Sequence, residues 1–569
     1  MTFPLLQIKD FSVDFISESG ITPAVKNISF NINHGETVAI VGESGSGKTV
    51  TSLSILQLLP SPPAKYKSGE ILFSKDGKNV VDILQLHEKE LRKIRGNNIS
   101  MIFQEPMTSL NPVKTCGKQV IEAMRIHNNI SLKEAEEKTI DLFAKVKLPD
   151  PASIAKRFPH EISGGQKQRV MIAMAISCHP SLLIADEPTT ALDVTVQKAI
   201  LQLIKELQVQ QNMSVIYITH DLGLVAEIAD RVIVMYKGEV VETGDIKDIF
   251  VNPKHPYTKA LLSCRPDASA KGKRLPVISD FLTVEEEISI QKPLVRTENH
   301  DNHHFSEILL EVKNLKVYFP VNKNFFGKVL KEFKAVDDVS FTVEKGETVG
   351  LVGESGCGKT TLGRALLRLI EPTSGNIFFN GKNIAEIPTG ELRKMRKDIQ
   401  IIFQDPYGSL NPRLTIGEAI NEPMKIHAIL PNQKERKEKI IDLLEKVDLK
   451  PEYFNRYPHE FSGGQRQRIC IARALGLNPD FIICDESVSA LDVSVQAQVL
   501  NLLNDLKEEL GFTCIFISHD LSVVHYISNR IMVMNKGRIE ETGSADQIYF
   551  HPKNEYTQNL ISAIPKVNL

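Results

Sequence analysis

The feature that most limits how this chain can fold is a repeat. The segment VGESGSGKT at residues 41–49 returns as VGESGCGKT at residues 352–360. IFQEP, SGGQ, ADEPTTALDV and ITHDL then recur in the same order as IFQDP, SGGQ, CDESVSALDV and ISHDL. Five ordered matches predict two tandem copies of one domain. Lys48 and Lys359 are 311 residues apart whereas Gln104 and Gln404 are 300 apart, so we expect a surface-loop insertion of about eleven residues in the first copy.

Composition supports several domains and excludes some functions. The chain has 569 residues, 42% of them apolar and 24% charged, which is too long for one core. A net charge of −2 gives no overall electrostatic reason for binding nucleic acid. Seven cysteines without a C-x-x-C pair, and an N-terminus without a signal pattern, predict reduced thiols and a cytoplasmic location. Apolar runs such as SLLIA are far shorter than the ~20 residues of a spanning helix, so a membrane function would need partners that span the membrane.

Each copy alternates short apolar runs with helix-compatible segments. ETVAIVG and ETVGLVG end in glycine and lead directly into KTVTSLSILQLL and KTTLGRALLRLI, which predicts a strand, a glycine loop and a helix. SLLIAD and DFIICD end in an acid, and MSVIYITH and FTCIFISH end in a histidine. Such runs are typical of strands buried on both faces of a mainly parallel sheet. We therefore predict an α/β fold in which these three kinds of ends converge at one edge of the sheet.

The two glycine loops fit the phosphate-binding pattern G-x-x-x-x-G-K-T. Glycines let successive backbone amides surround phosphate oxygens, the lysine places a charge on the outer phosphates, and the threonine offers a hydroxyl to Mg²⁺. The alternative is that each loop is only a flexible turn before a helix. The return of the same loop between a strand and a helix in the second copy disfavours this alternative. A tolerated thiol at Cys357, where the first loop has Ser46, is favoured over a redox role. The expected ATP-binding residues are Gly42, Glu43, Ser44, Gly45, Ser46, Gly47, Lys48 and Thr49, and Gly353, Glu354, Ser355, Gly356, Cys357, Gly358, Lys359, Thr360 and Thr361.

Two adjacent acids end each acidic strand, Asp186 and Glu187 in the first copy and Asp485 and Glu486 in the second. Adjacent carboxylates at a strand end diverge, so the first can face Mg²⁺ while the second acts on a water aimed at the γ-phosphate. The alternative is a solvated strand end without a role. Because each pair accompanies a glycine loop, we favour Glu187 and Glu486 as catalytic bases.

The ordered set of glycine loop, glutamine, SGGQ, DE, ALD and histidine resembles two ATP-binding-cassette (ABC) nucleotide-binding domains. This resemblance covers nearly the whole chain outside a linker. It implies two tandem P-loop domains, each with a mainly parallel sheet, an antiparallel β part and a helical signature subdomain, that hydrolyse ATP with Mg²⁺. The roles that rest on it are Gln104 and Gln404 at Mg²⁺, His220 and His519 at the γ-phosphate, and Phe15 and Phe319 stacked on adenine. Phe11 and Tyr318 stand nearby, and either phenylalanine could instead pack in the core.

The resemblance also gives the repeated SGGQ a role. It implies that SGGQ opens a helix whose amides and positive dipole end face the γ-phosphate held by the opposite domain. Each glycine loop would then work with the SGGQ of the other copy, and two ATP molecules would join the halves. Ile162 and Phe461 replace the commonest leucine before this motif. The signature residues are Ser163, Gly164, Gly165, Gln166, Ser462, Gly463, Gly464 and Gln465.

Segments outside the common motifs narrow the resemblance. EPMTSLNPVKT, DPYGSLNPRLT and NPKHPYTKALLSCRPD resemble the ATPase subunits of dipeptide and oligopeptide importers. The fused layout is similar to the double ATPases of microcin C and glutathione importers. The second copy keeps Tyr556 and Thr557 but has Asn554-Glu555 where His255-Pro256 stand in the first, which weakens the case that both extensions do the same job.

These features predict an ATPase subunit that drives peptide import. The expected domains are a first nucleotide-binding domain at residues 1–264, an extension and linker at 265–306, and a second nucleotide-binding domain with a short extension at 307–569. The expected partners are two transmembrane permease subunits and an extracytoplasmic substrate-binding protein, with no direct nucleic acid. The expected location is the cytoplasmic face of the inner membrane, peripherally.

Three other functions remain for comparison. A tandem-cassette translation factor acting on the ribosome would be expected to have a long, charged helical linker, whereas this linker has prolines and no helical period. A tandem sugar-importer ATPase would be expected to have one damaged site, and both sites here are complete. Exporters usually carry their own membrane spans. Co-purification with two hydrophobic permeases, or with ribosomes, separates an importer subunit from a translation factor.

Overall fold

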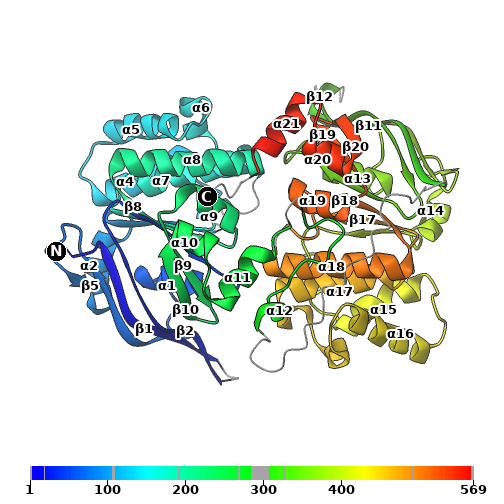
Figure 1. Ribbon diagram of the computed structural model, residues 1–569. Coiled ribbons are helices and arrows are strands. Elements are labelled where there is room, and N and C mark those ends of the chain that lie inside the picture. The colour runs from blue at the N-terminus through cyan, green and yellow to red at the C-terminus, as the bar shows by residue number, and fades with distance from the viewer. Residues whose placement is uncertain are drawn as a thin grey trace.

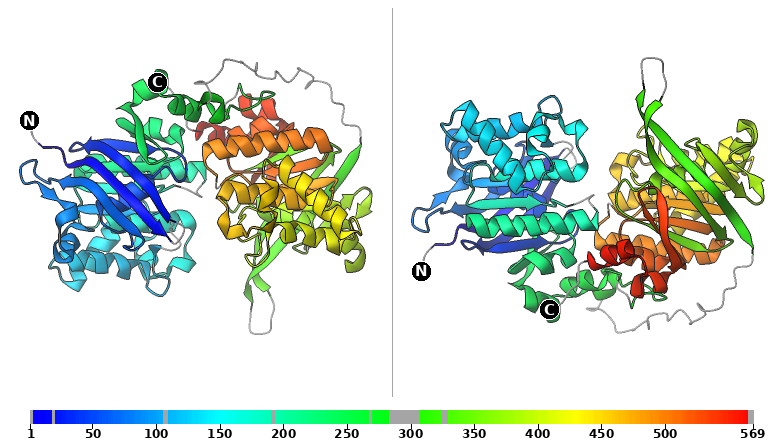
Figure 2. Two further views of the ribbon diagram at one scale, coloured as in Figure 1. Left: turned by 90° about the horizontal axis from the view of Figure 1, so that it is seen from below. Right: turned by 90° about the horizontal axis from the view of Figure 1, so that it is seen from above.

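The structure is a computed structural model that describes residues 3–17, 20–104, 109–189, 193–266, 269–282, 307–323, 329–489 and 491–564. Two halves of the same architecture lie side by side (Figure 1), and the views from below and from above agree (Figure 2). Each half combines a six-stranded, mainly parallel sheet with a four-stranded antiparallel sheet and a set of helices. The predicted α/β class with an antiparallel part is confirmed.

The two halves have matching sheets. The first half has the strand orders β2-β1-β4-β5 and β10-β9-β3-β8-β7-β6, and the second has β12-β11-β14-β15 and β16-β17-β18-β13-β19-β20. In each larger sheet the strand that comes last in the sequence, β10 or β20, is antiparallel to its neighbour, and the other pairs are parallel. The strands of the first half are β1 (Leu6–Ser17), β2 (Gly20–Ile32), β3 (Thr37–Val41), β4 (Ala64–Phe73), β5 (Val81–Asp82), β6 (Ile99–Ile102), β7 (Leu182–Asp186), β8 (Ser214–Thr219), β9 (Arg231–Tyr236) and β10 (Glu239–Asp245). Those of the second half are β11 (Ile308–Lys323), β12 (Val329–Glu344), β13 (Thr348–Val352), β14 (Ser374–Phe379), β15 (Lys382–Asn383), β16 (Ile399–Ile402), β17 (Phe481–Asp485), β18 (Thr513–Ile517), β19 (Arg530–Asn535) and β20 (Arg538–Ser544).

Helices cover the larger sheets and build a separate lobe in each half (Figure 1). The lobe is formed by α4 to α7 in the first half and by α15 to α17 in the second. The helices of the first half and its extension are α1 (Lys48–Ile55), α2 (Glu88–Ile94), α4 (Cys116–His127), α5 (Leu132–Lys145), α6 (Pro151–Lys156), α7 (Gly164–Ile176), α8 (Val194–Gln211), α9 (Leu222–Ile228), α10 (Ile246–Val251), α11 (Pro256–Ser263) and α12 (Ser279–Leu282), with short 3₁₀ turns at Ile83–Gln85 and Pro159–Glu161. Those of the second half are α13 (Lys359–Leu366), α14 (Thr389–Met395), α15 (Ile416–Ile426), α16 (Gln433–Lys446), α17 (Gly463–Leu475), α18 (Val493–Leu510), α19 (Leu521–Ile527), α20 (Ala545–Phe550) and α21 (Glu555–Ser562), with 3₁₀ turns at Pro451–Asn455 and Pro458–Glu460.

The central strands are the apolar runs that the sequence predicts to be buried. Every residue of β3, β7 and β8 is buried, and so is every residue of β13, β17 and β18. One apolar cluster fills the space between the first half's two sheets and takes in Ile55 of α1. A second cluster joins the opposite face of the larger sheet to the helical lobe and α8. Burial on both faces fixes the sheet and therefore the positions of the strand ends that carry the motifs.

The segment after α11 attaches the first half to the second. We call residues 271–278 the strap. Leu275 is 2% exposed, and its backbone N–H and C=O are both bonded to the side-chain amide of Asn501 on α18, at 3.0 and 2.8 Å. The Tyr526 hydroxyl on α19 donates to the Lys273 carbonyl at 3.0 Å. Backbone groups of an irregular segment are thus satisfied by buried side chains of the other half, which fixes the strap in place.

Charged side chains add to this docking at the surface. Arg274 pairs with Asp505 at 2.7 Å, and Lys271 pairs with Asp546 at 3.1 Å. At the corresponding positions of the first half, Gln202 stands in place of Asn501 and Glu227 in place of Tyr526. The strap site therefore belongs to the second half alone.

The predicted division into residues 1–264, 265–306 and 307–569 stays a proposal. Part of the expected linker, residues 283–306, lies outside the described residues. Within the described part, the strap lies against the second half, whereas Arg265 pairs with Asp221 of the first half at 3.1 Å. Of the helices in the described ranges, none is long and apolar enough to cross a lipid bilayer.

Candidate nucleotide sites

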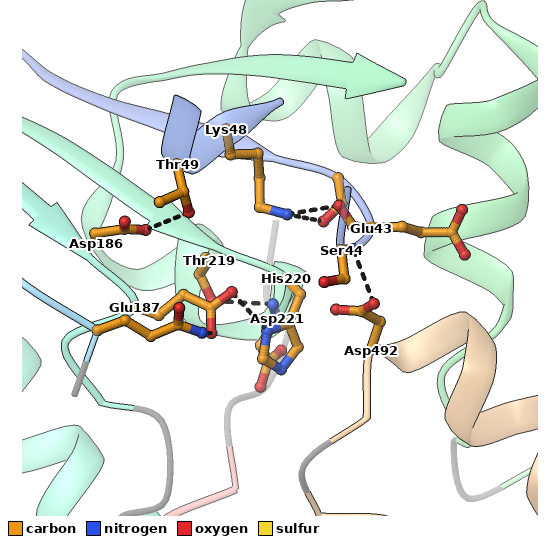
Figure 3. Close-up of polar contacts among 12 residues, drawn as sticks. Glu43, Ser44, Lys48, Thr49, Asp186, Glu187, Thr219, His220, Asp221 and Asp492 are labelled. Carbon is orange, nitrogen blue, oxygen red and sulfur yellow. Dashed lines mark hydrogen bonds and ion pairs between the residues drawn. The ribbon is translucent and has the colours of Figure 1, made fainter. Parts of the chain in front are cut away.

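The first glycine loop connects β3 to α1 (Figure 3). Gly42, Gly45 and Gly47 have φ angles of 152, 79 and 100°, which L-residues rarely adopt. A Cβ atom on Gly42 would lie 2.2 Å from the carbonyl oxygen of Met235 on β9. Glycine is therefore required at this position, because the loop passes directly against the neighbouring strand.

The loop lysine in each half lies inside the loop. The Lys48 ammonium donates to the carbonyls of Gly42 and Glu43 at 2.7 and 2.8 Å (Figure 3). Lys359 does the same to Gly353 and Glu354 at 2.7 and 3.0 Å. Burial lowers the pKa of Lys48, and nearby acids oppose this effect. The loop thus places one cation among inward-curving backbone groups, which is the arrangement that a phosphate chain needs.

The predicted metal-binding acid and hydroxyl meet in both halves. Thr49 Oγ1 donates to Asp186 Oδ1 at 3.3 Å, and Thr360 Oγ1 donates to Asp485 Oδ1 at 2.9 Å. Asp186 is 1% exposed, and burial, with the charge of Glu187, raises its pKa to about 6. A buried carboxylate beside a hydroxyl is a set of hard oxygen donors that fits Mg²⁺. Among the described residues, no cluster of three or more His, Cys, Asp or Glu side chains suits a metal, so any Mg²⁺ would need oxygens from water or phosphate as well.

The second acid turns away from the first by a backbone twist. β7 ends at Asp186, and Glu187 has a φ of 46°, in the left-handed region; Glu486 has the same φ after β17. The divergence of the two carboxylates was expected from strand alternation, whereas the structure produces it with a left-handed residue just beyond the strand. Such a conformation costs roughly 1 kcal/mol and is often found at functional sites.

Side chains from two other strands hold this glutamate. Gln104 Nε2, after β6, donates to Glu187 Oε2 at 3.0 Å, and His220 Nδ1, after β8, lies 3.3 Å from Glu187 Oε1. In the second half Gln404 donates to Glu486 at 2.7 Å, and His519 Nδ1 lies 3.8 Å from Glu486. The ends of β6, β7 and β8 therefore converge at this glutamate. The sequence predicts convergence of the ends of β3, β7 and β8, and the contacts of Thr49 with Asp186 and of His220 with Glu187 bring those three together as well.

Burial and pairing have opposite effects on these groups. Burial acts to raise the pKa of Glu486, but the hydrogen bond and charge of His519, together with Lys359 and Gln404, outweigh it and leave that pKa lowered. Burial acts to lower the pKa of His519, but Glu486 outweighs it and leaves that pKa raised. The pair favours an ionised glutamate beside a protonated histidine, which is the state that a base needs before it accepts a proton.

SGGQ opens a helix in both halves, as predicted. The hydroxyl of Ser163 accepts the Gln166 N–H at 3.4 Å, and the Gln166 side chain accepts the Ser163 N–H at 3.1 Å, which is a capping box at the start of α7. Ser462 and Gln465 repeat this arrangement at α17. Part of the motif is thus explained by helix capping alone.

The two glycines of the motif meet different surroundings. A Cβ on Gly464 would lie 2.3 Å from the side chain of Val495 on α18, whereas one on Gly463 would have no atom closer than 4.0 Å. Packing in the second cassette therefore leaves no room for a side chain at Gly464, whereas in the first cassette a Cβ on Gly165 would lie 3.1 Å from Val196. Gly463, the first glycine of the motif, leaves the helix start open.

Each glycine loop contacts the opposite half at the aspartate that ends ALD and the residues just after it. The N–H of Ser44 donates to Asp492 at 2.8 Å (Figure 3), and the N–H of Ser355 donates to Asp193. Beside these bonds, Thr195 donates to Glu354 at 2.8 Å, and Ser494 donates to Glu43. The sequence interpretation used ALD only to recognise the family and missed these contacts. The aspartate that ends ALD in both copies was the available signal.

Comparison with known proteins places the chain in a family. The family profile described as "ABC transporter" matches residues 25–190 and 336–489, and the one described as "Oligopeptide/dipeptide transporter, C-terminal region" matches residues 241–289. The glutathione import ATP-binding protein GsiA of Escherichia coli K12 is 49% identical over 99% of this chain and 89% of that protein. The GsiA of Shigella sonnei gives the same figures. This chain belongs to the ABC transporter family.

The chain is accordingly an ATP-binding cassette ATPase with two cassettes. A solved dimeric structure of the ATP-binding cassette MJ0796, bound to ADP and Pi, is 29% identical and covers 42% of this chain and 98% of that one, with a TM-score of 0.38. The match over residues 241–289 agrees with the importer class expected from the HPYT segment. The translation factor considered as an alternative is not favoured.

The expected adenine-stacking residues have different environments in the two cassettes. Phe15 is partly buried and packs against the apolar cluster of the first antiparallel sheet. Phe319 is 39% exposed and lies opposite Phe333 in the register of β11 and β12. Their role with adenine stays a prediction. The expected contact of each SGGQ with the opposite ATP site also stays a prediction.

Proposed function

We propose that this chain is the ATP-hydrolysing subunit of an importer for peptides or peptide-like compounds. The observation that carries the proposal is the combination of two cassettes with residues 241–289, which match the C-terminal region of oligopeptide and dipeptide transporters. A relative named for glutathione import is similar over 99% of the chain. Glutathione is therefore the first cargo to test, followed by short peptides.

The site residues support a division of labour in each cassette. The glycine loop and Lys48 or Lys359 would hold the phosphates of ATP. The oxygen donors that would hold Mg²⁺ are Thr49, Gln104 and Asp186 in the first site and Thr360, Gln404 and Asp485 in the second. Bound Mg²⁺ would neutralise charge on the outer phosphates.

The chain's own acid and histidine would carry the proton step. Glu187 and Glu486 would accept a proton from the attacking water. His220 and His519 would steady that glutamate and contact the γ-phosphate, as the family resemblance implies. Gln104 and Gln404 bond to the same glutamates, so a change at either site reaches the segment that follows each glutamine.

Partners complete the transport function. We propose two transmembrane permease subunits, which would bind near the segments after Gln104 and Gln404, and an extracytoplasmic binding protein that selects the cargo. Closure of the two cassettes on ATP would move the permeases, and a loaded binding protein would favour the closed state. The chain would then lie at the cytoplasmic face of the inner membrane, held there by its partners.

The test is the ATPase rate in three mixtures: the chain alone, the chain with reconstituted permeases, and that complex with binding protein and glutathione or peptide. We expect cargo to stimulate hydrolysis only in the third mixture. Stimulation of the isolated chain by cargo, or stimulation by ribosomes instead, would contradict the importer assignment.

A further inference from the structure

The extension that follows each cassette reaches back to its own glycine loop. The hydroxyl of Tyr257 on α11 accepts the backbone N–H of Glu43 at 2.9 Å. The hydroxyl of Tyr556 on α21 accepts the N–H of Glu354 at 3.1 Å. Tyr257 is fully buried and Tyr556 partly so. Two helices at the junction of the halves (Figure 1) thus each contribute one hydroxyl to an ATP site.

The bond falls on a peptide group that the loop lysine also holds. The C=O of Gly42 and the N–H of Glu43 belong to the same peptide group. Lys48 donates to that oxygen at 2.7 Å while Tyr257 accepts from that nitrogen. Because the C=O and N–H of a peptide point in opposite directions, the group is fixed from two sides.

The second cassette repeats the arrangement. Lys359 donates to Gly353 O at 2.7 Å, and Tyr556 accepts from Glu354 N. A peptide held in this way cannot rotate without breaking both bonds. The tyrosine therefore limits the orientation of the first peptide of the phosphate loop.

Different sequences build the same support for the two tyrosines. His255 Nδ1 accepts the Tyr257 N–H at 3.1 Å, and the Asn554 side chain accepts the Tyr556 N–H at 2.8 Å. Both residues cap the first turn of the helix that carries the tyrosine. The change from His-Pro to Asn-Glu, which in sequence weakened the case for a shared role, leaves the hydroxyl in the same place.

In each cassette a glutamate of the last strand binds the turn that precedes the helix. Glu242 accepts the N–H groups of Lys254 and His255 at 2.7 and 3.1 Å. Glu541 accepts the N–H groups of Lys553 and Asn554 at 2.8 and 3.1 Å. The position of each hydroxyl is therefore determined by the last strand of its own cassette.

The residue that the tyrosine holds is also bound by the other cassette. The carboxylate of Glu43 accepts a hydrogen bond from Ser494, and that of Glu354 accepts one from Thr195 at 2.8 Å. Each glutamate therefore has its amide fixed by its own extension and its side chain by the opposite cassette. A shift of the extension changes both the loop and this contact.

We propose that Tyr257 and Tyr556 are positioning residues of the two ATP sites, which hold the first peptide of the glycine loop in the orientation that binds phosphates. The C-terminal extension then sets the affinity of its own site for nucleotide. The proposal rests on the proposed function only in taking ATP as the ligand of these loops.

The test replaces each tyrosine by phenylalanine in the full chain, Tyr257→Phe and Tyr556→Phe. The ring stays and only the acceptor oxygen is lost, so the partly buried N–H of Glu43 or Glu354 loses this partner. We expect the KM for ATP and the dissociation constant of ATP to rise about tenfold at the affected site, with kcat changed by less than about threefold, because Glu187 and Glu486 are untouched. Photolabelling with 8-azido-ATP and peptide mapping should show the loss at the Lys48 site for Tyr257→Phe and at the Lys359 site for Tyr556→Phe.

Tyr236→Phe is the matched control, because its ring stacks on Tyr257 with centroids 4.2 Å apart, and ATP affinity should stay unchanged. A merely structural role would lower the thermal midpoint and kcat together and leave KM unchanged, which would overturn the proposal. If Tyr257→Phe does not fold, the less buried Tyr556→Phe gives the same test. Failure of the unaltered chain to bind ATP would refute the proposed function as well, whereas normal binding with unchanged affinity in both variants would refute this proposal alone.

Discussion

At the scale of single residues, Glu187 and Glu486 are held closely by their neighbours. Each follows a buried strand in a left-handed conformation, and each is held by a glutamine and a histidine from the two flanking strands. A side chain held from both sides has little freedom to reorient. This suits a group that must aim one water molecule.

Replacing these acids should stop turnover without loss of ATP binding. We expect Glu187→Gln together with Glu486→Gln to lower kcat at least about 100-fold, which is the usual contribution of a general base, because amides are far weaker bases. The two single variants should be impaired to within about tenfold of each other, since in both sites a glutamine and a histidine flank the glutamate. Steady-state ATPase rates and equilibrium ATP binding check this, and near-normal hydrolysis in the double variant would contradict the assignment.

His525 gives a pH prediction for the second cassette. Its side chain is 1% exposed, and its Nε2 lies 2.7 Å from Asp546, which also pairs with Lys271 of the strap. Burial lowers the pKa of His525, and Lys271 adds to this, whereas Asp546 opposes it. The unfolded chain therefore binds this proton more readily than the folded one, so stability falls as the pH decreases through the normal histidine range.

The expected result is a larger loss of thermal stability between pH 7.5 and pH 5.5 in the natural chain than in His525→Gln. The difference in slope has an upper limit of about 1.4 kcal/mol per pH unit for one proton. Scanning calorimetry at the two pH values measures it. Equal losses in both proteins would show that His525 does not titrate differently on folding.

The meeting of the candidate site residues was foreseeable because local pattern and strand ends determine it. Asp186 and His220 stand at or just after the ends of continuous apolar runs, Lys48 follows the glycine loop after a third such run, and parallel strands bring these ends together. Tyr257 was not foreseeable in this way. Its hydroxyl acts on a loop more than 200 residues earlier, and no local period in the sequence records that contact.

Among the elements, the strap has the clearest energetic role. Eight residues without regular structure are held by a buried amide and a buried phenol of the second cassette. The sequence places the strap in a mixed, aperiodic stretch, so it was predicted only as part of a linker. Its docking depends on Asn501 and Tyr526, which nothing in their own helices marks as special.

Asn501→Ala should release the strap. The variant loses both hydrogen bonds to the backbone of Leu275. Because an unsatisfied buried backbone group costs about 1–3 kcal/mol, detachment of the strap becomes easier than keeping the Leu275 N–H and C=O buried without partners. Trypsin should then cleave after Lys271, Lys273 or Arg274 about tenfold faster than in the natural chain. Gln202→Ala, at the corresponding position of the first cassette, is the control and should leave the cleavage rate unchanged; equal rates in the two variants would count against the docking.

For the whole molecule, the contacts between the cassettes are reciprocal. Asp193 and Asp492 each bind a backbone amide in the glycine loop of the other cassette. No single copy of the sequence shows which loop its ALD segment will meet. This arrangement follows only from the way the two folded halves pack together.

Asp193→Ala should therefore impair the site of Lys359, and Asp492→Ala the site of Lys48. The lost bond is charge-assisted but lies at an exposed loop, so we expect a loss of about fivefold in hydrolysis at that site, which corresponds to about 1 kcal/mol, the net value of an ordinary hydrogen bond. Nucleotide trapping with peptide mapping resolves the two sites. A loss at the site of the same cassette would refute the crossed arrangement.

The strap has a further consequence for how far the two cassettes can separate. Between Cys264, buried at the end of the first cassette's extension, and Lys271, where the strap begins, the chain has only seven residue steps, which span at most roughly 24 Å. On this side of the molecule, the two cassettes are thus joined by a short connection that limits their separation. Opening would then be a rotation of the two cassettes about this short connection. The two cassettes stay at a high effective concentration and meet again in the same register after every cycle, however dilute the protein is.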